Sequence, residues 1–280
     1  MREIHCQEIT EKVAELCQDA NYKLGEDVLL SLKKATETEV SPTGKEVLEQ
    51  LLVNARIAYE EQVPMCQDTG LAVVFLEIGQ NLRIVGGELE EAINQGVAAG
   101  YTKGYLRKSV VNHPLIRKNT NDNTPAIIHT KIVPGENLKI TVAPKGGGSE
   151  NMSAIKMLPP SAGRRGIINF IVETVRKAGA NPCPPIVVGV GIGGNFEKAA
   201  LMAKEALLRP VGTPSSDEDI AALEQEVLET VNKLGIGPQG FGGRTTALAV
   251  HINTYPCHIA SLPVAVNLNC HAARHRSIVL

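Results

Sequence analysis

Tryptophan is absent from this sequence of 280 residues, and aromatic residues of all kinds make up 3% of it. A surface that stacks single-stranded nucleic acid needs aromatic side chains, so such a partner is not expected. An excess of charge of one sign is also missing. The formal net charge of −2 gives no general attraction to nucleic acid or to anionic membranes. We therefore expect any anionic ligand to be held by a local basic site.

Long apolar runs are absent as well, and none approaches the roughly 20 residues that cross a bilayer. The first residues, MREIHC, lack the pattern of a secretory signal, which favours a soluble cytoplasmic protein with no membrane partner. Apolar residues make up 43% of the chain, enough for a sizeable core. Since no repeat, low-complexity tract or flexible linker divides the sequence, we predict one domain over residues 1–280.

The apolar residues recur with helical and strand periods in alternating parts of the chain. The helical period predicts helices at residues 9–24, 26–36, 44–61, 88–99, 165–178, 195–208 and 217–234. Apolar or β-branched runs predict strands at residues 71–78, 125–133, 138–143, 186–190, 245–254 and 259–267. The expected fold is therefore mixed α/β, with helices first, a mixed sheet, and special residues in the loops that join the elements.

The six cysteines form no CxxC pair and do not suggest a secreted disulfide framework. Three of them lie in segments that read as loops, namely Cys66, Cys183 and Cys270. The other three are left out of the site. Cys17 shares an apolar helix face and is expected to be a core residue, and Cys6 has no partner context. Cys257 competes for a ligand role, but it lies close to a strand pattern and is expected to be in the core.

Three thiolates are one short of the four that usually hold an iron–sulfur cluster. A cluster on three cysteines would leave one iron open to water or substrate. That arrangement is suited to Lewis-acid catalysis rather than to electron transfer.

Polar neighbours set the loop cysteines apart from core cysteines. Gln67 and Asp68 follow Cys66 directly, so one turn offers a thiolate, an amide and a carboxylate. Two prolines stiffen the backbone on either side of Cys183, and basic residues follow Cys270. His258 could hold or relay a proton if it lay near Asp68.

Anion-binding candidates are a glycine run and several arginines. Backbone N–H groups of the run at residues 146–148 could approach a ligand closely, and Ser149 could cap a following helix. Guanidinium groups pair with carboxylates in a bidentate way. The candidate carboxylate-binding arginines are Arg107, Arg164, Arg165 and Arg244.

The segment GVGIGG at residues 189–194 matches the GxGxxG pattern of nucleotide-binding turns. That fingerprint also requires a second strand ending in an acidic residue about 20 positions on, where this sequence has a loop entering a helix. A tight turn from strand to helix is the favoured interpretation, and a nucleotide site is the alternative.

Five ordered motifs carry a resemblance to a known family. They are PMCQDTG at 64–70, KGGGSEN at 145–151, GVGIGG at 189–194, GGRTT at 242–246 and NLNCHA at 267–272. Together they resemble the α subunit of two-subunit class I fumarate hydratases and of the related L-tartrate dehydratases. The likeness runs nearly from end to end.

The resemblance implies a [4Fe-4S] cluster on three cysteines, with the open iron coordinating a small dicarboxylate. By motif, the cluster cysteines are Cys66, Cys183 and Cys270. Gln67 and Asp68 resemble active-site residues beside the cluster, and His258 resembles the partner of Asp68. The substrate carboxylate pocket is expected to include Gln67, Arg107, Gly146, Gly147 and Gly148.

The activity that the resemblance implies is reversible hydration of fumarate to malate, a reaction of the tricarboxylic acid cycle. L-tartrate dehydration is the alternative, and mesaconate is a further possible substrate. A β subunit is expected to complete the site in an α2β2 assembly, which would leave this chain alone inactive. Two other classes stay open: a nucleotide-dependent oxidoreductase and a non-catalytic iron–sulfur protein.

Overall fold

The computed structural model describes residues 2–280 and confirms a mixed α/β fold. The chain divides into two compact units. Unit 1 consists of residues 2–24, 54–147 and 274–280, and unit 2 consists of residues 25–53 and 148–273. Each unit has a four-stranded mixed sheet of its own, and a short two-stranded sheet adds to unit 1. Whether residues 1–280 act as one domain stays a prediction.

Unit 1 is built on a sheet with the strand order β10-β5-β2-β4. Its strands are β2 (Leu71–Gly79), β4 (Ile127–Val133), β5 (Leu138–Lys145) and β10 (Arg276–Val279). β2 pairs in parallel with β4 and antiparallel with β5, which also pairs antiparallel with β10. The short strands β1 (Arg2–His5) and β3 (Leu82–Val85) pair in parallel beside it.

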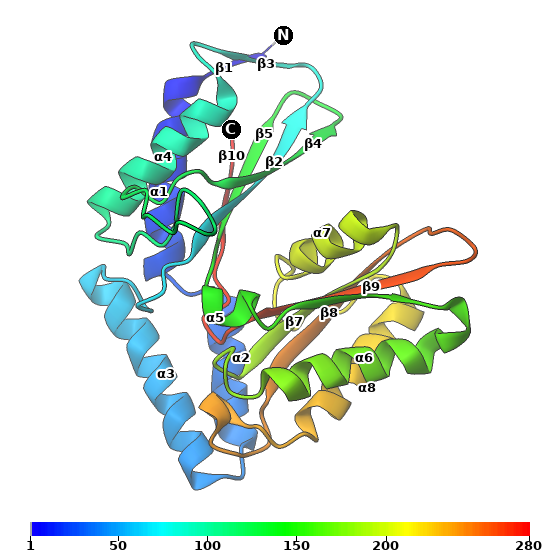
Figure 1. The fold of residues 1–280 in the computed structure, drawn as a ribbon. Coiled ribbons are helices and arrows are strands. Elements are labelled where there is room, and N and C mark those ends of the chain that lie inside the picture. Colours follow the sequence, from blue (N-terminus) through cyan, green and yellow to red (C-terminus); the bar gives the residue numbers. More distant parts are fainter. Residues whose placement is uncertain (1) are drawn as a thin grey trace. The chain divides into compact units, whose positions relative to one another are not determined.

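Two helices of unit 1, α1 (Cys6–Tyr22) and α4 (Leu89–Lys103), lie side by side and pack on this sheet (Figure 1). Close approach is possible because Gly96 and Gly100 of α4 face α1, where an added Cβ would meet the carbonyl oxygens of Thr10 and Ala14. Apolar side chains of both helices and of β2 and β5 share one core. This core anchors the segments that lead into and out of β2.

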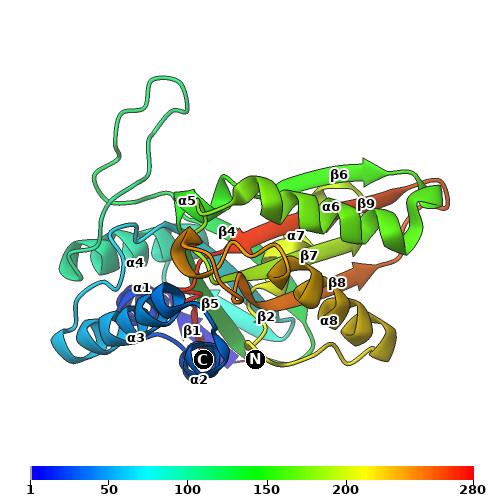
Figure 2. The same cartoon turned by 90° about the horizontal axis from the view of Figure 1, so that it is seen from below.

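Unit 2 contains a sheet with the order β6-β9-β7-β8 (Figure 2). Its strands are β6 (Ala154–Leu158), β7 (Ile186–Gly193), β8 (Ala247–Tyr255) and β9 (Leu262–Asn269), and β7–β8 is the parallel pair. The helices of this unit are α2 (Glu26–Thr38), α6 (Gly163–Ala178), α7 (Phe196–Ala206) and α8 (Glu218–Asn232). Side chains of α6 and α8 share a core with the sheet, while Ala199 and Ala203 of α7 pack with Ala265 of β9.

The glycine pattern at residues 189–194 is explained by helix packing. A Cβ at Gly189 would collide with the carbonyl oxygen of Ala203, and a Cβ at Gly191 with that of Ala199. Both carbonyls belong to α7, so glycine lets this helix lie directly on β7. The predicted tight turn lies at the end of β7, and within the strand Gly189 and Gly191 have a packing role that requires no nucleotide.

Four short strands were not expected from the sequence: β1, β3, β6 and β10. β10 lies in the basic C-terminal segment, where the polar residues hide its strand character. The remaining elements are α3 (Pro42–Glu61), which contributes residues to both units, the single turn α5 (Gly147–Glu150), and the 3-10 turns Pro160–Ala162 and Pro238–Gly240. Across residues 2–280, no helix has the length and apolar character needed to cross a membrane.

Candidate functional site

The turn at residues 66–70 links α3 to β2 in unit 1 and carries three of the predicted site residues. Cys66 and Asp68 are half-buried, and Gln67 is exposed. Gly70 has a φ of +75°, and a Cβ there would collide with the backbone of Lys145, so the turn needs glycine at this position. Met65, just before the turn, donates its N–H to the carbonyl oxygen of Asn21 at 3.0 Å.

The Asp68 carboxylate is fixed by two backbone donors. Its Oδ1 accepts a hydrogen bond from the N–H of Gly70 at 3.0 Å, and its Oδ2 accepts one from the N–H of Gly147 at 2.7 Å. A Cβ on Gly146 would lie only 3.2 Å from the same Oδ2. The structure thus brings Asp68 together with two of the three predicted loop glycines. The N–H of Gly147 holds Asp68 and is not directed at a separate ligand.

Buried side chains hold the backbone of this turn in place. The Tyr101 hydroxyl donates to the carbonyl oxygens of Thr69 and Gly70, at 2.8 and 3.0 Å, and Asn123 Nδ2 donates to the carbonyl oxygen of Gly70 at 3.1 Å. Burial raises the pKa of Tyr101, which keeps its hydroxyl protonated as a donor. Sequence reasoning missed Tyr101 and Asn123, because they are 31 and 53 residues from Gly70 and no local pattern links them to the turn.

Arg107 lies beside the same turn through its backbone. The Thr69 hydroxyl donates to the carbonyl oxygen of Arg107 at 2.9 Å, while the Arg107 side chain is exposed. An exposed guanidinium can pair with an anion that enters from solvent. Its role as a carboxylate ligand stays a prediction.

Cys183 and Cys270 belong to unit 2, and a hydrogen-bond network joins their loops. The N–H of His271, next to Cys270, donates to the carbonyl oxygen of Cys183 at 3.3 Å. Gln239 donates its backbone N–H (2.7 Å) and side-chain amide (2.8 Å) to the carbonyl oxygen of Pro184, and its Nε2 lies 3.1 Å from His271 Nδ1. Two predicted cluster ligands are therefore carried by loops that support each other.

Cys183 has a left-handed backbone conformation, with a φ of +55°. Residues other than glycine rarely adopt this region, and they keep it where the surrounding structure imposes it. The thiol of Cys183 is exposed and that of Cys270 half-exposed. Gln239 was missed by sequence reasoning, since nothing in its local sequence marks it as a partner of Pro184, 55 residues away.

His258 and Gly148, the other predicted site residues, also belong to unit 2. His258 lies in the exposed loop between β8 and β9, where its Nδ1 accepts the N–H of Ala260 at 3.1 Å. A Cβ on Gly148 would lie 3.2 Å from the carbonyl oxygen of Asn181. The pairing of His258 with Asp68, which is in unit 1, stays a prediction. Ser149 lies inside the one-turn helix α5 rather than capping a longer one.

The remaining cysteines separate into two buried ones and one exposed one. Cys17 is buried in the core of unit 1, as its helix face predicted, and burial raises its pKa to about 12. Cys6 is buried in the same core. The expectation that Cys257 is a core residue was wrong. β8 ends at Tyr255 and a proline follows, so Cys257 lies in an exposed loop, where its thiol donates to the carbonyl oxygen of Ser261 at 3.3 Å.

The chemistry of the three loop cysteines suits an iron–sulfur cluster. All three are at least partly accessible and carried on loops, in contrast to the buried Cys17, whose raised pKa disfavours the thiolate. Among residues 2–280, no group of three or more His, Cys, Asp and Glu side chains is gathered as it would be around a metal ion. The suitability of these cysteines for a cluster therefore rests on their chemistry and accessibility, and not on a set of ligands that is already gathered around a metal position.

The GGRTT segment in unit 2 is held by a buried carboxylate that sequence reasoning missed. Glu39, at the end of α2, accepts hydrogen bonds from the N–H groups of Arg244, at 2.8 and 2.9 Å, and of Thr245, at 2.9 Å. Burial alone would raise the pKa of Glu39. The N–H groups of Arg244, Ser41, Thr245 and Val40 outweigh it and lower that pKa to about 2. The Arg244 side chain itself is exposed.

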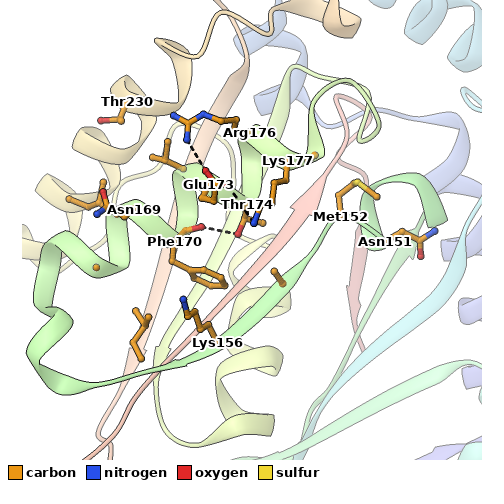
Figure 3. A pocket seen from close by; sticks show the side chains of 16 residues that line it. Asn151, Met152, Lys156, Asn169, Phe170, Glu173, Thr174, Arg176, Lys177 and Thr230 are labelled. Carbon is orange, nitrogen blue, oxygen red and sulfur yellow. Dashed lines mark hydrogen bonds and ion pairs between the residues drawn. The ribbon is translucent and has the colours of Figure 1, made fainter.

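A cavity of about 970 Å³ lies between α6 and β6 in unit 2 (Figure 3). Lys156 and Phe170 contribute to its lining, together with Glu173, which pairs with Arg176 at 2.8 Å and with Lys177 at 3.4 Å. None of the predicted site residues lines this cavity. The cavity is therefore separate from the candidate site described above.

Comparisons with known proteins agree with the motifs. The sequence profile of the family described as Fumarate hydratase (Fumerase) matches residues 10–279. A protein of Methanocaldococcus jannaschii, provisionally named L(+)-tartrate dehydratase subunit alpha, is 46% identical over 272 residues, which are 95% of each chain. The L(+)-tartrate dehydratase subunit alpha of Escherichia coli strain K12 is 32% identical over 97% of this chain and 90% of its own length. The chain therefore belongs to the fumarate hydratase family, a family of hydro-lyases.

Proposed function

We propose that this chain is the α subunit of a two-subunit hydro-lyase that removes water from a hydroxy-dicarboxylate. The observation that carries the proposal is the turn at residues 66–70. There, a half-buried thiol lies two residues from a carboxylate that is fixed by Gly70 and Gly147. The relatives are named as alpha subunits, which supports a β partner. An α2β2 assembly is the stoichiometry that we propose.

Cys66, Cys183 and Cys270 are proposed to hold a [4Fe-4S] cluster. When bound, such a cluster supplies a Lewis acid that makes hydroxide a better leaving group near neutral pH. Three ligands leave one position free for the substrate, as expected for a catalytic metal site.

Asp68 is proposed to hold the proton that goes to the departing hydroxyl group and to take it back during hydration. Each of its carboxylate oxygens accepts one backbone N–H, which leaves a further lone pair on each for a proton or for substrate. His258 is proposed to exchange this proton with Asp68. We assign the N–H of Gly147 to orienting Asp68.

The substrate carboxylates are proposed to be bound by Arg107 and Gln67, which are exposed, and by Gly146 and Gly148, since the N–H of Gly147 is already taken by Asp68. A guanidinium gives bidentate pairing with a carboxylate, and an amide can donate one further hydrogen bond. Binding of this kind places the reacting carbon and its hydroxyl group in a fixed orientation.

Two substrates are supported by different findings. The family profile is that of fumarate hydratase, and sequence reasoning favoured fumarate and malate. The reported relatives are instead named L(+)-tartrate dehydratase subunit alpha. On the 46% identity to one of them, we propose L(+)-tartrate as the first substrate and malate as the second. Loss of water from tartrate gives an enol that becomes oxaloacetate.

The test is a comparison of kcat/KM values for the α chain together with its β partner after anaerobic reconstitution with iron and sulfide. L(+)-tartrate, malate, fumarate and mesaconate are assayed in parallel, with D-tartrate as the stereochemical control. The proposal expects turnover of L(+)-tartrate to exceed that of the other three. A higher kcat/KM for fumarate or malate would reverse the order of the two substrates and leave the hydro-lyase assignment standing.

A further inference from the structure

Arg274 is a buried cation with a single hydrogen-bond acceptor among residues 2–280. Only 4% of its surface is exposed, and its Nη2 donates to the carbonyl oxygen of Asp68 at 2.5 Å. Its Nε and Nη1 have no hydrogen-bond partner among the described residues. Burying a guanidinium without pairing its other donors is energetically costly. The one bond that Arg274 makes therefore indicates where the residue acts.

The bond to Asp68 completes a series of three anchored carbonyls. The carbonyl oxygens of Asp68, Thr69 and Gly70 each accept hydrogen bonds from buried side chains: Arg274 for the first, Tyr101 for the second and third, and Asn123 for the third. These donors come from α4, from the loop between α4 and β4, and from the C-terminal segment of unit 1. The last three peptide planes of the turn are therefore held from outside the turn.

Fixing these peptide planes also fixes the Asp68 side chain. The carboxylate reaches its two donors, the N–H groups of Gly70 and Gly147, only while the backbone of Asp68 keeps its orientation. A hydrogen bond from a charged donor is stronger than one between neutral groups. The guanidinium of Arg274 is therefore well suited to hold the carbonyl of Asp68 through one contact. Arg274 touches no carboxylate oxygen of Asp68, so its effect is on geometry.

We propose that Arg274 is a positioning residue for Asp68: it holds the peptide plane from which the carboxylate is directed at Gly147. This inference rests on the proposed function in that Asp68 is taken as the proton-transfer group. The positioning itself is a property of the chain and can be measured without turnover.

Arg276 provides a matched control two residues away. Its Nη2 also donates to backbone carbonyl oxygens, those of Lys23 at 2.7 Å and of Leu24 at 3.5 Å, and these lie outside the turn. A general contribution of a C-terminal arginine to stability would appear in variants of both residues. A positioning role would appear at Arg274 alone.

The experiment compares Arg274→Gln with Arg276→Gln in the full α chain assembled with its β partner. Hydrogen exchange of the peptide that covers residues 66–70 reports the turn, and kcat and KM report its consequence. For Arg274→Gln we expect exchange to rise about 10-fold or more, and kcat to fall about 10- to 100-fold with KM changed less than about 3-fold. Arg276→Gln should leave both quantities near the wild-type values.

Equal exchange at residues 66–70 in the two variants would overturn the proposal, as would a change in KM alone. If Arg274→Gln does not fold, Arg274→Lys replaces it, with Arg276→Lys as its control. The ammonium is shorter and lacks the planar fork, so the same rise in exchange and fall in kcat are expected. Wild-type exchange and kcat in Arg274→Lys would then overturn the proposal. If the wild-type complex shows no hydro-lyase activity, the proposed function fails, while the exchange data still decide the positioning role.

Discussion

The N–H of Gly147 donates a hydrogen bond to Oδ2 of Asp68 at 2.7 Å, across 79 residues of sequence. This bond joins two of the segments that carry the family resemblance, PMCQDTG and KGGGSEN. It gives the glycine run a specific task, which is to let the backbone come close to a carboxylate. Several predictions about activity depend on that closeness.

Gly146→Ala should disturb Asp68, whereas Gly147→Ala should be tolerated. A Cβ at residue 146 would lie 3.2 Å from Oδ2 of Asp68, which is tighter than ordinary contact, and a Cβ at residue 147 would lie 3.8 Å away. Displacement of the carboxylate is expected to lower kcat about 10-fold in Gly146→Ala. Steady-state kinetics of the two variants measure the difference. Equal kcat values would show that Asp68 is not confined by this loop.

Serine replacements test the cluster ligands. Cys66→Ser, Cys183→Ser and Cys270→Ser are each expected to lose most of the iron and sulfide after anaerobic reconstitution, because serine does not replace a thiolate ligand well. Cys257→Ser is the matched control, since Cys257 is an exposed cysteine in a loop outside the proposed ligand set. Iron and sulfide analysis of the purified chains gives the result. Full cluster content in any of the first three variants would remove that cysteine from the ligand set.

His251 should make the fold sensitive to mild acid. Burial lowers the pKa of His251 to about 4, and the neighbouring Arg209 adds to the effect, while Glu224 opposes it. Because the folded protein favours the neutral ring, the contribution of His251 to the free energy of unfolding is fully present above the unfolded pKa of 6.5. This contribution, up to about 3 kcal/mol, is lost as the pH falls from 6.5 toward 4.

Denaturant unfolding of the wild type and of His251→Asn between pH 7 and pH 4 measures this loss. The asparagine side chain can still donate to the carbonyl oxygen of Ala206, which lies 3.2 Å from His251 Nδ1. The variant should therefore show a flatter dependence on pH across this range. Parallel curves for the two proteins would contradict the prediction.

Glu39→Gln should destabilise unit 2 and loosen the GGRTT segment. The Glu39 carboxylate is 2% exposed and accepts hydrogen bonds from four backbone N–H groups, which an amide cannot all replace. We expect a loss of about 1–3 kcal/mol in the free energy of unfolding at pH 7. Glu37→Gln, an exposed carboxylate on the same helix, should have little effect. A similar loss in both variants would refute the special role of Glu39.

The pH window of Glu39 differs from that of His251. Folding lowers the pKa of Glu39 from 4.5 to about 2, so its contribution is present above pH 4.5 and is lost as the pH falls toward 2. Unfolding measured between pH 4.5 and pH 2 should therefore show a further loss of stability in the wild type that is absent in Glu39→Gln.

Local patterns predicted the long elements but not the short ones. The helical period identified α1, α6 and α8 because each has a continuous apolar face over 15 residues or more. β1, β3 and β10 have four residues each and β6 has five, too few for alternation to stand out. Cys257 was assigned to the core because the pattern of β8 seemed to continue past Tyr255.

The sequence predicted those parts of the site that lie within a single local motif. Cys66, Gln67 and Asp68 were identified because their chemistry is concentrated in one turn. The contacts that hold this turn, from Tyr101 and from Arg274, span 32 and 206 residues, and the Glu39 contacts to residues 244 and 245 span a similar distance. Such pairs depend on the topology of the fold, and no local pattern encodes them.

The most direct test of the central claim is formation of oxaloacetate from L(+)-tartrate by the α chain with its β partner. The complex is assayed before and after anaerobic reconstitution with iron and sulfide, with malate and fumarate in parallel. Our account predicts that the reconstituted complex eliminates or adds water on at least one of these substrates and that the complex without iron does not. A fully loaded complex that turns over none of them would contradict it.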